Sequence, residues 1–168
     1  RMRDAFQRST VWFYQELARR IGEPQMRALL EREGYGNADT GGGIDQFWLS
    51  GELRISADEQ VDFLRRLRAR QLGFSPRAMD AVTELLVMEQ GADSRGAWVL
   101  RGKTGWARPG GPQVGWLVGW LERDGGAWFY AMNIEVPEGE PARFAVRPAI
   151  VRAVLAAEGL LDAPADGG

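Results

Sequence analysis

The sequence has one lysine, Lys103, among its 21 lysine and arginine residues, and it stands in the tetrapeptide Lys-Thr-Gly-Trp at 103–106. An ammonium is a compact point charge whose pKa shifts on burial, which a guanidinium is not. A hydroxyl at Thr104 and a glycine at Gly105, which lets a ligand approach the backbone, suit an anionic or carbonyl ligand. Taken alone, the tetrapeptide is more commonly a strand end followed by a turn.

The sequence has no histidine and no cysteine. Their absence means that residues 1–168 cannot themselves form Ser-His-Asp or Cys-His triads, imidazole or thiolate metal sites, or disulfides. Chemistry here would use hydroxyl, amine, carboxyl, amide and backbone groups. Ser9, Trp48 and Arg147 are candidates, although each also has an ordinary interpretation. Ser9 could be an N-cap, Trp48 core filler, and Arg147 a surface charge or a partner of C-terminal carbonyls. Tyr35-Gly36-Asn37 is, by itself, a turn sequence.

Length and charge restrict the class of protein. The 168 residues suit one domain, and 21 basic against 23 acidic residues give a net charge of −2, which does not favour a nucleic-acid partner. No apolar run approaches the roughly 18 residues that span a bilayer, so no membrane partner is expected. No signal-peptide pattern follows Arg1, which predicts either a protein that is not exported or an N-terminus further upstream. Residues 163–168 are predicted to be a frayed end.

Helical patterns fill the first half of the chain. Apolar spacing and capping signals predict four helices. The first has apolar spacing from Tyr14 and ends at Gly22, and the second runs from Pro24 to Gly34. The third follows the capping box Ser56-x-x-Glu59, and the fourth runs from Ser75-Pro76 to about Gln90. Residues 35–51 are rich in Gly, Asn and Asp and are predicted to form a long ordered loop. Loops of that length are usually functional or disordered, and Phe47-Trp48-Leu49 argues against disorder.

The second half of the chain is predicted to form strands at 97–104, 114–122 and 127–136, with a hairpin turn at Asp124-Gly125-Gly126. Both faces of 114–122 are apolar, so helices should cover the sheet on both sides. A last helix ends at Gly159, and its predicted buried stripe is Val146, Ile150, Val151, Val154 and Leu155. The fold class is therefore α+β, a helical layer plus an antiparallel sheet.

Four short motifs occur in a fixed order along the chain. They are Ser-x-Val at Ser9 and Val11, Tyr-Gly-Asn at 35–37, Phe-Trp-Leu at 47–49 and Lys-Thr-Gly-Trp at 103–106. The ordered set resembles the class D β-lactamases (oxacillinases) among the serine penicillin-recognising enzymes. The resemblance covers essentially the whole chain and implies a β-lactamase/transpeptidase-like fold.

One family motif is missing from the sequence. The family's catalytic serine and its base come from a Ser-x-x-Lys motif upstream of Ser-x-Val, and Leu100 stands three positions before the only lysine. We therefore expect residues 1–168 to be the C-terminal two thirds of a single domain, with 1–92 mainly helical and 93–162 holding the strands and last helix. The missing N-terminal segment would then be a partner of these residues.

The resemblance implies hydrolysis of β-lactams through a serine acyl-enzyme, with a lysine carbamate formed from carbon dioxide as the general base. Both groups would lie on the missing segment, and no other cofactor or metal is expected. Residue roles follow the motifs: Ser9 relays a proton, Lys103 orients Ser9, Trp48 donates to the carbamate, and the Trp106 N–H completes the oxyanion hole. The substrate-binding residues implied are Thr104, Gly105, Arg147, Val11 and Leu49, of which Val11 and Leu49 keep the base pocket dry.

Three other functions remain open at this point. A penicillin-sensing receptor domain and a cell-wall transpeptidase share these motifs, but both tend to have Asn at the position of Val11, which favours the hydrolase. The third alternative is an inert fragment without a nucleophile. The family also implies a periplasmic or secreted location and a role in antibiotic resistance. A homodimer is left open.

Overall fold

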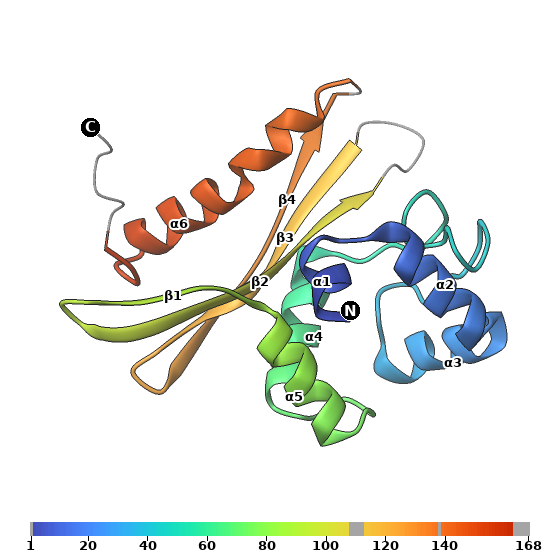
Figure 1. The fold of residues 1–168 in the computed structure, drawn as a ribbon, viewed down its shortest axis with the longest axis horizontal. Coiled ribbons are helices and arrows are strands. Elements are labelled where there is room, and N and C mark those ends of the chain that lie inside the picture. Colours follow the sequence, from blue (N-terminus) through green and yellow to red (C-terminus); the bar gives the residue numbers. More distant parts are fainter. Residues whose placement is uncertain (1, 108–112, 138, 163–168) are drawn as a thin grey trace.

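The computed structural model describes residues 2–107, 113–137 and 139–162, and it has helices on both sides of one sheet (Figure 1). The helices are α1 (Met2–Gln7), α2 (Val11–Ile21), α3 (Glu23–Glu33), α4 (Ala57–Arg68), α5 (Pro76–Leu85), the 3-10 helix η1 (Pro141–Val146) and α6 (Arg147–Ala157). The strands are β1 (Val87–Asp93), β2 (Gly96–Ala107), β3 (Gln113–Arg123) and β4 (Gly126–Val136).

The sheet is an antiparallel meander in the order β1-β2-β3-β4. Its centre is the pairing of β2 with β3, which runs from Trp98↔Arg123 to Ala107↔Val114. Gly119 permits this close pairing, because a Cβ at that position would lie 1.9 Å from the carbonyl oxygen of Arg101. The predicted α+β class and the hairpin between β3 and β4 are confirmed.

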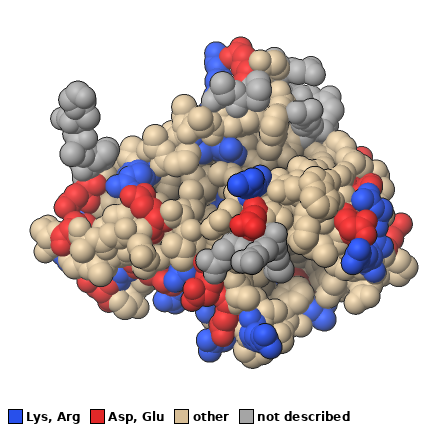
Figure 2. All heavy atoms as spheres, in the orientation of Figure 1, with Lys and Arg blue, Asp and Glu red and all other residues tan. Residues whose placement is uncertain are grey.

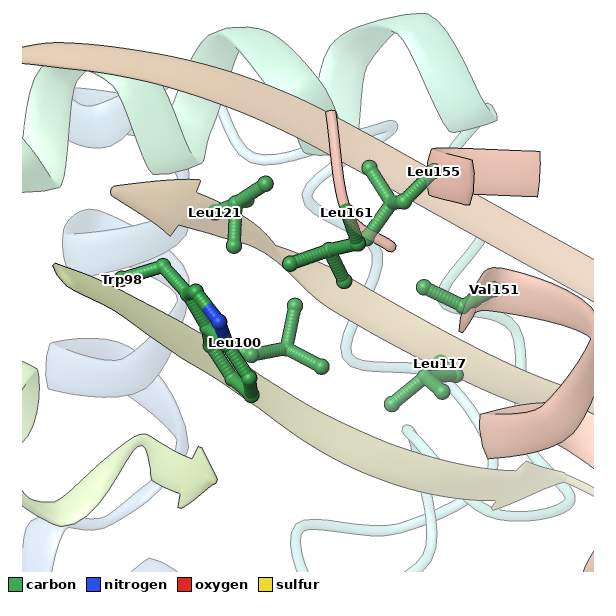
Figure 3. Close-up of a cluster of buried hydrophobic side chains, with 7 residues drawn as sticks. All are labelled: Trp98, Leu100, Leu117, Leu121, Val151, Leu155 and Leu161. Atoms are coloured by element: carbon green, nitrogen blue, oxygen red, sulfur yellow. The ribbon is translucent and has the colours of Figure 1, made fainter. Parts of the chain in front are cut away.

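The two faces of β3 belong to different hydrophobic clusters, as its sequence predicted. Leu117 and Leu121 pack with β2 and α6, and Figure 3 shows these side chains pointing toward one another from the sheet and the helix. Trp120 is fully buried in the second cluster with residues of α4 and α5. The cluster in Figure 3 comprises Trp98, Leu100, Leu117, Leu121, Val151, Leu155 and Leu161.

Local signals explain where two helices begin. The Ser56 side chain accepts from the Glu59 N–H, and the Glu59 carboxylate accepts from the Ser56 N–H, which forms the predicted capping box of α4. At the start of α5 the Ser75 side chain accepts from the Ala78 N–H, with Pro76 in the first turn.

Several sequence predictions were wrong in detail. The helix predicted to reach Gln90 ends at Leu85, and residues 87–93 instead form β1. This strand crosses the predicted boundary at 92 between the mainly helical part and the part that holds the strands. The apolar spacing of this stretch resembles a helix, but pairing with β2 outweighs it. In the last helix only Val151 and Leu155 of the predicted stripe are buried, while Val146, Ile150 and Val154 are exposed. Helix α1 was not predicted. The predicted frayed end at 163–168 lies outside the described residues.

Charge is distributed over the surface without a large patch of one sign on the face that Figure 2 shows. Among the described residues, no helix is long and apolar enough to cross a membrane.

Candidate active site

The side chain of Lys103 connects β2 to the start of α2. Its Nζ donates to the Oγ of Ser9, in the turn between α1 and α2, and to the carbonyl oxygen of Thr104 at 2.9 Å. Ser9 has a φ of 49°, in the left-handed region that serine rarely adopts. The contact therefore joins two residues 94 positions apart, at a point where the backbone is locally strained.

The surroundings of Lys103 are apolar and positively charged. Its Nζ lies 5.7 Å from the centre of the Phe6 ring. Burial lowers the pKa of the Lys103 ammonium below its ordinary value of 10.5, and the nearby charge of Arg147 lowers the pKa further. Both effects disfavour the charged form of the Lys103 side chain relative to a lysine in water.

Arg147, the first residue of α6, is bound to the sheet. Its Nη1 donates to the carbonyl oxygens of Gly105 at 2.6 Å and Trp116 at 2.8 Å, and its Nε donates to that of Phe144 at 2.7 Å. Two of these carbonyls belong to β2 and β3. Arg147 is therefore a partner of backbone carbonyls, as one of its two ordinary interpretations had it, although the carbonyls of Gly105 and Trp116 lie in β2 and β3 rather than at a helix end.

The edge of β2 beside Lys103 is available to a ligand. Pairing with β1 ends at Val87↔Arg101, so residues 103–107 pair with β3 alone among the described strands. Gly105 and Trp106 both border the cleft there. The Trp106 ring lies away from this edge: its Nε1 donates to Gln113 Oε1 at 2.8 Å and the ring packs against Phe144.

The predicted ordered loop is confirmed as a segment of turns closed at its base by Asn37. The Asn37 side chain donates to the Glu52 carbonyl at 2.8 Å and accepts from the Arg54 N–H at 2.9 Å. A Cβ on Gly36, which has a positive φ of 55°, would lie 2.0 Å from the Arg54 carbonyl oxygen. Tyr-Gly-Asn thus closes the loop, and we name residues 37–54 the Trp48 loop.

Trp48 lies within this loop with an indole N–H that donates to none of the residues the structure describes, although its ring contacts Phe47 edge to face. Trp48 and Leu49 face both of the cavities described below. A buried indole usually finds an acceptor. The N–H of Trp48 is therefore a donor available to a group that enters the cavity.

The elements enclose a cleft of about 760 Å³. All nine site residues implied by the resemblance line it: Ser9, Val11, Trp48, Leu49, Lys103, Thr104, Gly105, Trp106 and Arg147. Its charged lining among the described residues is Lys103 and Arg147, so the cleft suits an anion. Among those residues, no cluster of three or more His, Cys, Asp or Glu could hold a metal ion.

Sequence reasoning missed four lining residues, Tyr14, Gln15, Gln46 and Ser50. Tyr14 and Gln15 follow Val11 by three and four positions, which is the spacing of one helix face. Gln46 and Ser50 flank Phe-Trp-Leu. Both pairs could have been found by extending each motif along its own element.

A second cavity of about 490 Å³ lies on the side of the sheet that α1, α4 and α5 cover. It shares Trp48, Leu49 and residues 103–106 with the cleft. Most of its wall is apolar or aromatic, including Phe6, Phe47 and Phe63. Tyr35 is a polar member of the wall; burial raises the pKa of its hydroxyl, which donates to Gln60 Oε1 at 3.0 Å.

Solved class D β-lactamases share this fold. The class D β-lactamase YbXI from Nostoc has a TM-score of 0.86 and 43% identity, covering 95% of this chain and 65% of that chain. FUS-1 (OXA-85), a class D β-lactamase from Fusobacterium nucleatum subsp. polymorphum, has a TM-score of 0.87 and 34% identity, covering 95% and 64%.

The chain belongs to the penicillin binding protein transpeptidase domain family, whose sequence profile matches residues 1–156. Relatives include Beta-lactamase OXA-48 of Klebsiella pneumoniae, 40% identical over 94% of this chain and 57% of the relative. Another is Beta-lactamase OXA-2 of Salmonella typhimurium, 40% identical over 92% and 53%. The predicted resemblance to class D β-lactamases is therefore confirmed. The chain spans about half the length of the curated relatives it matches.

Proposed function

We propose that this protein hydrolyses β-lactams through a serine acyl-enzyme, with the described cleft as its substrate site. The observation that carries the proposal is the convergence of all nine candidate residues on that one cleft, from the turn before α2, α2 itself, the Trp48 loop, β2 and α6. Similarity to enzymes that are named class D β-lactamases supports the reaction.

The nucleophile and the general base are proposed to come from a Ser-x-x-Lys helix outside residues 1–168, since the only lysine here is Lys103. The second cavity, with its largely apolar wall beside Trp48 and Lys103, is the proposed seat of that helix. Residues 1–168 would then form the C-terminal two thirds of the domain.

Ser9 and Lys103 are proposed to move the proton in acylation. The nucleophilic serine loses its proton to the general base as its Oγ bonds to the lactam carbonyl carbon. The C–N bond breaks, and Ser9 delivers its own proton to the departing nitrogen and regains one from the base. The Lys103 ammonium holds the Ser9 Oγ by a hydrogen bond and therefore fixes its position. In deacylation, water attacks the ester carbonyl, and the enzyme serine is released with its proton.

Trp48 is proposed to hold the general base. Carbon dioxide, when bound, supplies that base as a carbamate on the motif lysine. The indole N–H of Trp48 is an available donor at the cavity wall, which suits a carbamate oxygen. Val11 and Leu49 line the cleft together with Trp48 and are proposed to exclude water from the base.

The substrate carboxylate is proposed to bind Thr104 and Arg147, near Lys103, in a cleft whose charged residues are cations. On the edge of β2, where pairing with β1 ends at Arg101, the Trp106 backbone N–H is proposed as half of an oxyanion hole for the carbonyl oxygen. Gly105 carries no side chain on this edge, which lets substrate approach the backbone.

We further propose a location in the periplasm or outside the cell, with antibiotic resistance as the outcome of the activity. β-Lactams enter from outside, so an exported hydrolase would meet them before their targets. Cell fractionation with activity in the periplasmic or secreted fraction tests this location.

Penicillin turnover by the intact protein, with and without added bicarbonate, tests the proposed function. We expect hydrolysis by the wild type at ambient bicarbonate. Trp48→Ala should lose the carbamate and stall deacylation, and added bicarbonate should restore part of the rate. Unchanged turnover of Trp48→Ala without bicarbonate would rule out the role of Trp48, and absence of hydrolysis by the wild type would contradict the function itself.

A further inference from the structure

Asp45 is the point at which the Trp48 loop contacts α2 by both an ion pair and a backbone hydrogen bond. The Arg19 Nη1 lies 2.5 Å from Asp45 Oδ2, and Gln15 Nε2 donates to the Asp45 carbonyl oxygen at 3.2 Å. Arg19 and Gln15 are four positions apart, so they lie on one face of the helix. Two donors of α2 thus hold one residue of the loop.

The same helix face leads to the cleft. Val11, the first residue of α2, and Gln15, one turn later, both line the cleft. Arg19 follows one further turn along. A residue held by Gln15 and Arg19 is therefore held at a fixed distance from Val11.

A short, hydrogen-bonded path leads from Asp45 to Trp48. The Phe47 N–H donates to the Gly43 carbonyl at 2.9 Å, and the Leu49 N–H donates to the Gln46 carbonyl at 2.8 Å. These turns leave little freedom between Asp45 and the side chains of Trp48 and Leu49, three and four residues later.

The other supports of the loop are elsewhere. Asn37 closes its base against Glu52 and Arg54, and Thr40 accepts from Arg27 of α3 at 2.9 Å. Neither contact involves α2. Among the hydrogen bonds and ion pairs of the described residues, only those of Asp45 join the Trp48 loop to α2.

We infer that Asp45 is a positioning residue for the general-base pocket: through Arg19 and Gln15 it sets Trp48 and Leu49 against Val11. The inference rests on the proposed function for its chemistry, while the positioning itself is a property of the loop. The ion pair is about half exposed, with side-chain exposures of 48% for Arg19 and 32% for Asp45. Pairs of this exposure add little to global stability, so loss of the contact should loosen the loop without unfolding the protein.

The test compares Asp45→Ala with the conservative Asp45→Glu in the intact protein. Arg20→Ala is the matched control, because Arg20 also lies on α2 but pairs with Glu16 at 2.8 Å and not with the loop. Amide hydrogen exchange over residues 43–53 measures positioning, penicillin turnover against bicarbonate concentration measures the base, and thermal melting measures stability.

Asp45→Ala should raise loop exchange by about fivefold and should cut turnover at ambient bicarbonate by about fivefold, the size that an exposed pair supports. Saturating bicarbonate should restore the rate, Asp45→Glu should recover part of both effects, and Arg20→Ala should show neither. Unchanged loop exchange in Asp45→Ala would overturn the inference whether or not the protein hydrolyses penicillin. Faster exchange with unchanged bicarbonate dependence would overturn it too, since Asp45 would then be a structural tether only. A wild type without turnover would instead refute the proposed function, and the loop exchange would still decide whether Asp45 positions Trp48.

Discussion

Replacing Arg147 with alanine should destabilise the protein well beyond the loss of a surface charge. The guanidinium donates three hydrogen bonds of 2.6–2.8 Å to carbonyl oxygens of Phe144, Gly105 and Trp116. These bonds attach η1 and α6 to the ends of β2 and β3. Their loss leaves three partly buried carbonyls to find water.

The expected cost can be worked out from these bonds. A hydrogen bond to a charged group contributes roughly 1.5–3 kcal/mol to stability. The three bonds share one partly exposed side chain, so they are not additive, and we expect a total loss of about 3 kcal/mol. For a protein of this size that loss lowers Tm by roughly 6–12 °C. Arg147→Lys keeps the charge but offers one nitrogen to three carbonyls, and about half the loss should remain.

The assay is thermal melting of the intact protein, with Arg143→Ala as the control. Arg143 is exposed and pairs with Glu140 in the preceding turn, so its loss should change Tm by no more than about 2 °C. If Arg147→Ala melted as the wild type does, the three carbonyl bonds would not hold the sheet to α6, and the reasoning from this geometry would be refuted.

Three further predictions follow from burial and charge. Leu121→Ala, at a side chain with 0% exposure, should cost about 2–5 kcal/mol in urea unfolding with an unchanged m-value, and a loss below 1 kcal/mol would contradict its place in the core. The Arg123 guanidinium lowers the pKa of Asp93 from 3.8 to about 2, so its contribution to stability is complete above pH 3.8 and is lost as the pH falls toward 2. Asp93→Asn should therefore flatten the stability curve between pH 4 and 2, and an unchanged curve would refute the pairing. Burial and Arg147 lower the pKa of Lys103, so kcat/KM should fall with rising pH at a pH below 10.5, and Arg147→Ala should move that fall to higher pH. A fall at the same pH in both proteins would exclude Lys103 as its cause.

Short-range patterns predicted most of the elements. The capping box at Ser56 and the Ser75-Pro76 pair fix where α4 and α5 begin, because caps act within one turn. The alternation of Leu117 and Leu121 with Trp120 predicted a sheet covered on both faces. The candidate site was predicted from ordered motifs and their resemblance, but the meeting of these residues in one cleft depends on the packing of the α1–α2 turn against β2, which places Ser9 next to Lys103.

The failures have tertiary causes. The sequence of β1 does not alternate clearly between apolar and polar residues, and its strand form depends on pairing with β2, which no local pattern reveals. Arg147 looks like an ordinary helix-end charge, because its partners Gly105 and Trp116 lie 42 and 31 residues away. Asp45 resembles any loop carboxylate for the same reason, since Arg19 is 26 residues distant.

Whether the protein forms an acyl-enzyme and then hydrolyses it is tested by intact mass spectrometry before and after addition of a penicillin. We predict a polypeptide heavier than 18.7 kDa, with an adduct of the penicillin's mass that appears and then decays as substrate is consumed. A lasting adduct would contradict the hydrolase and favour a penicillin sensor or a transpeptidase. An 18.7 kDa polypeptide without an adduct would contradict the acyl-enzyme altogether.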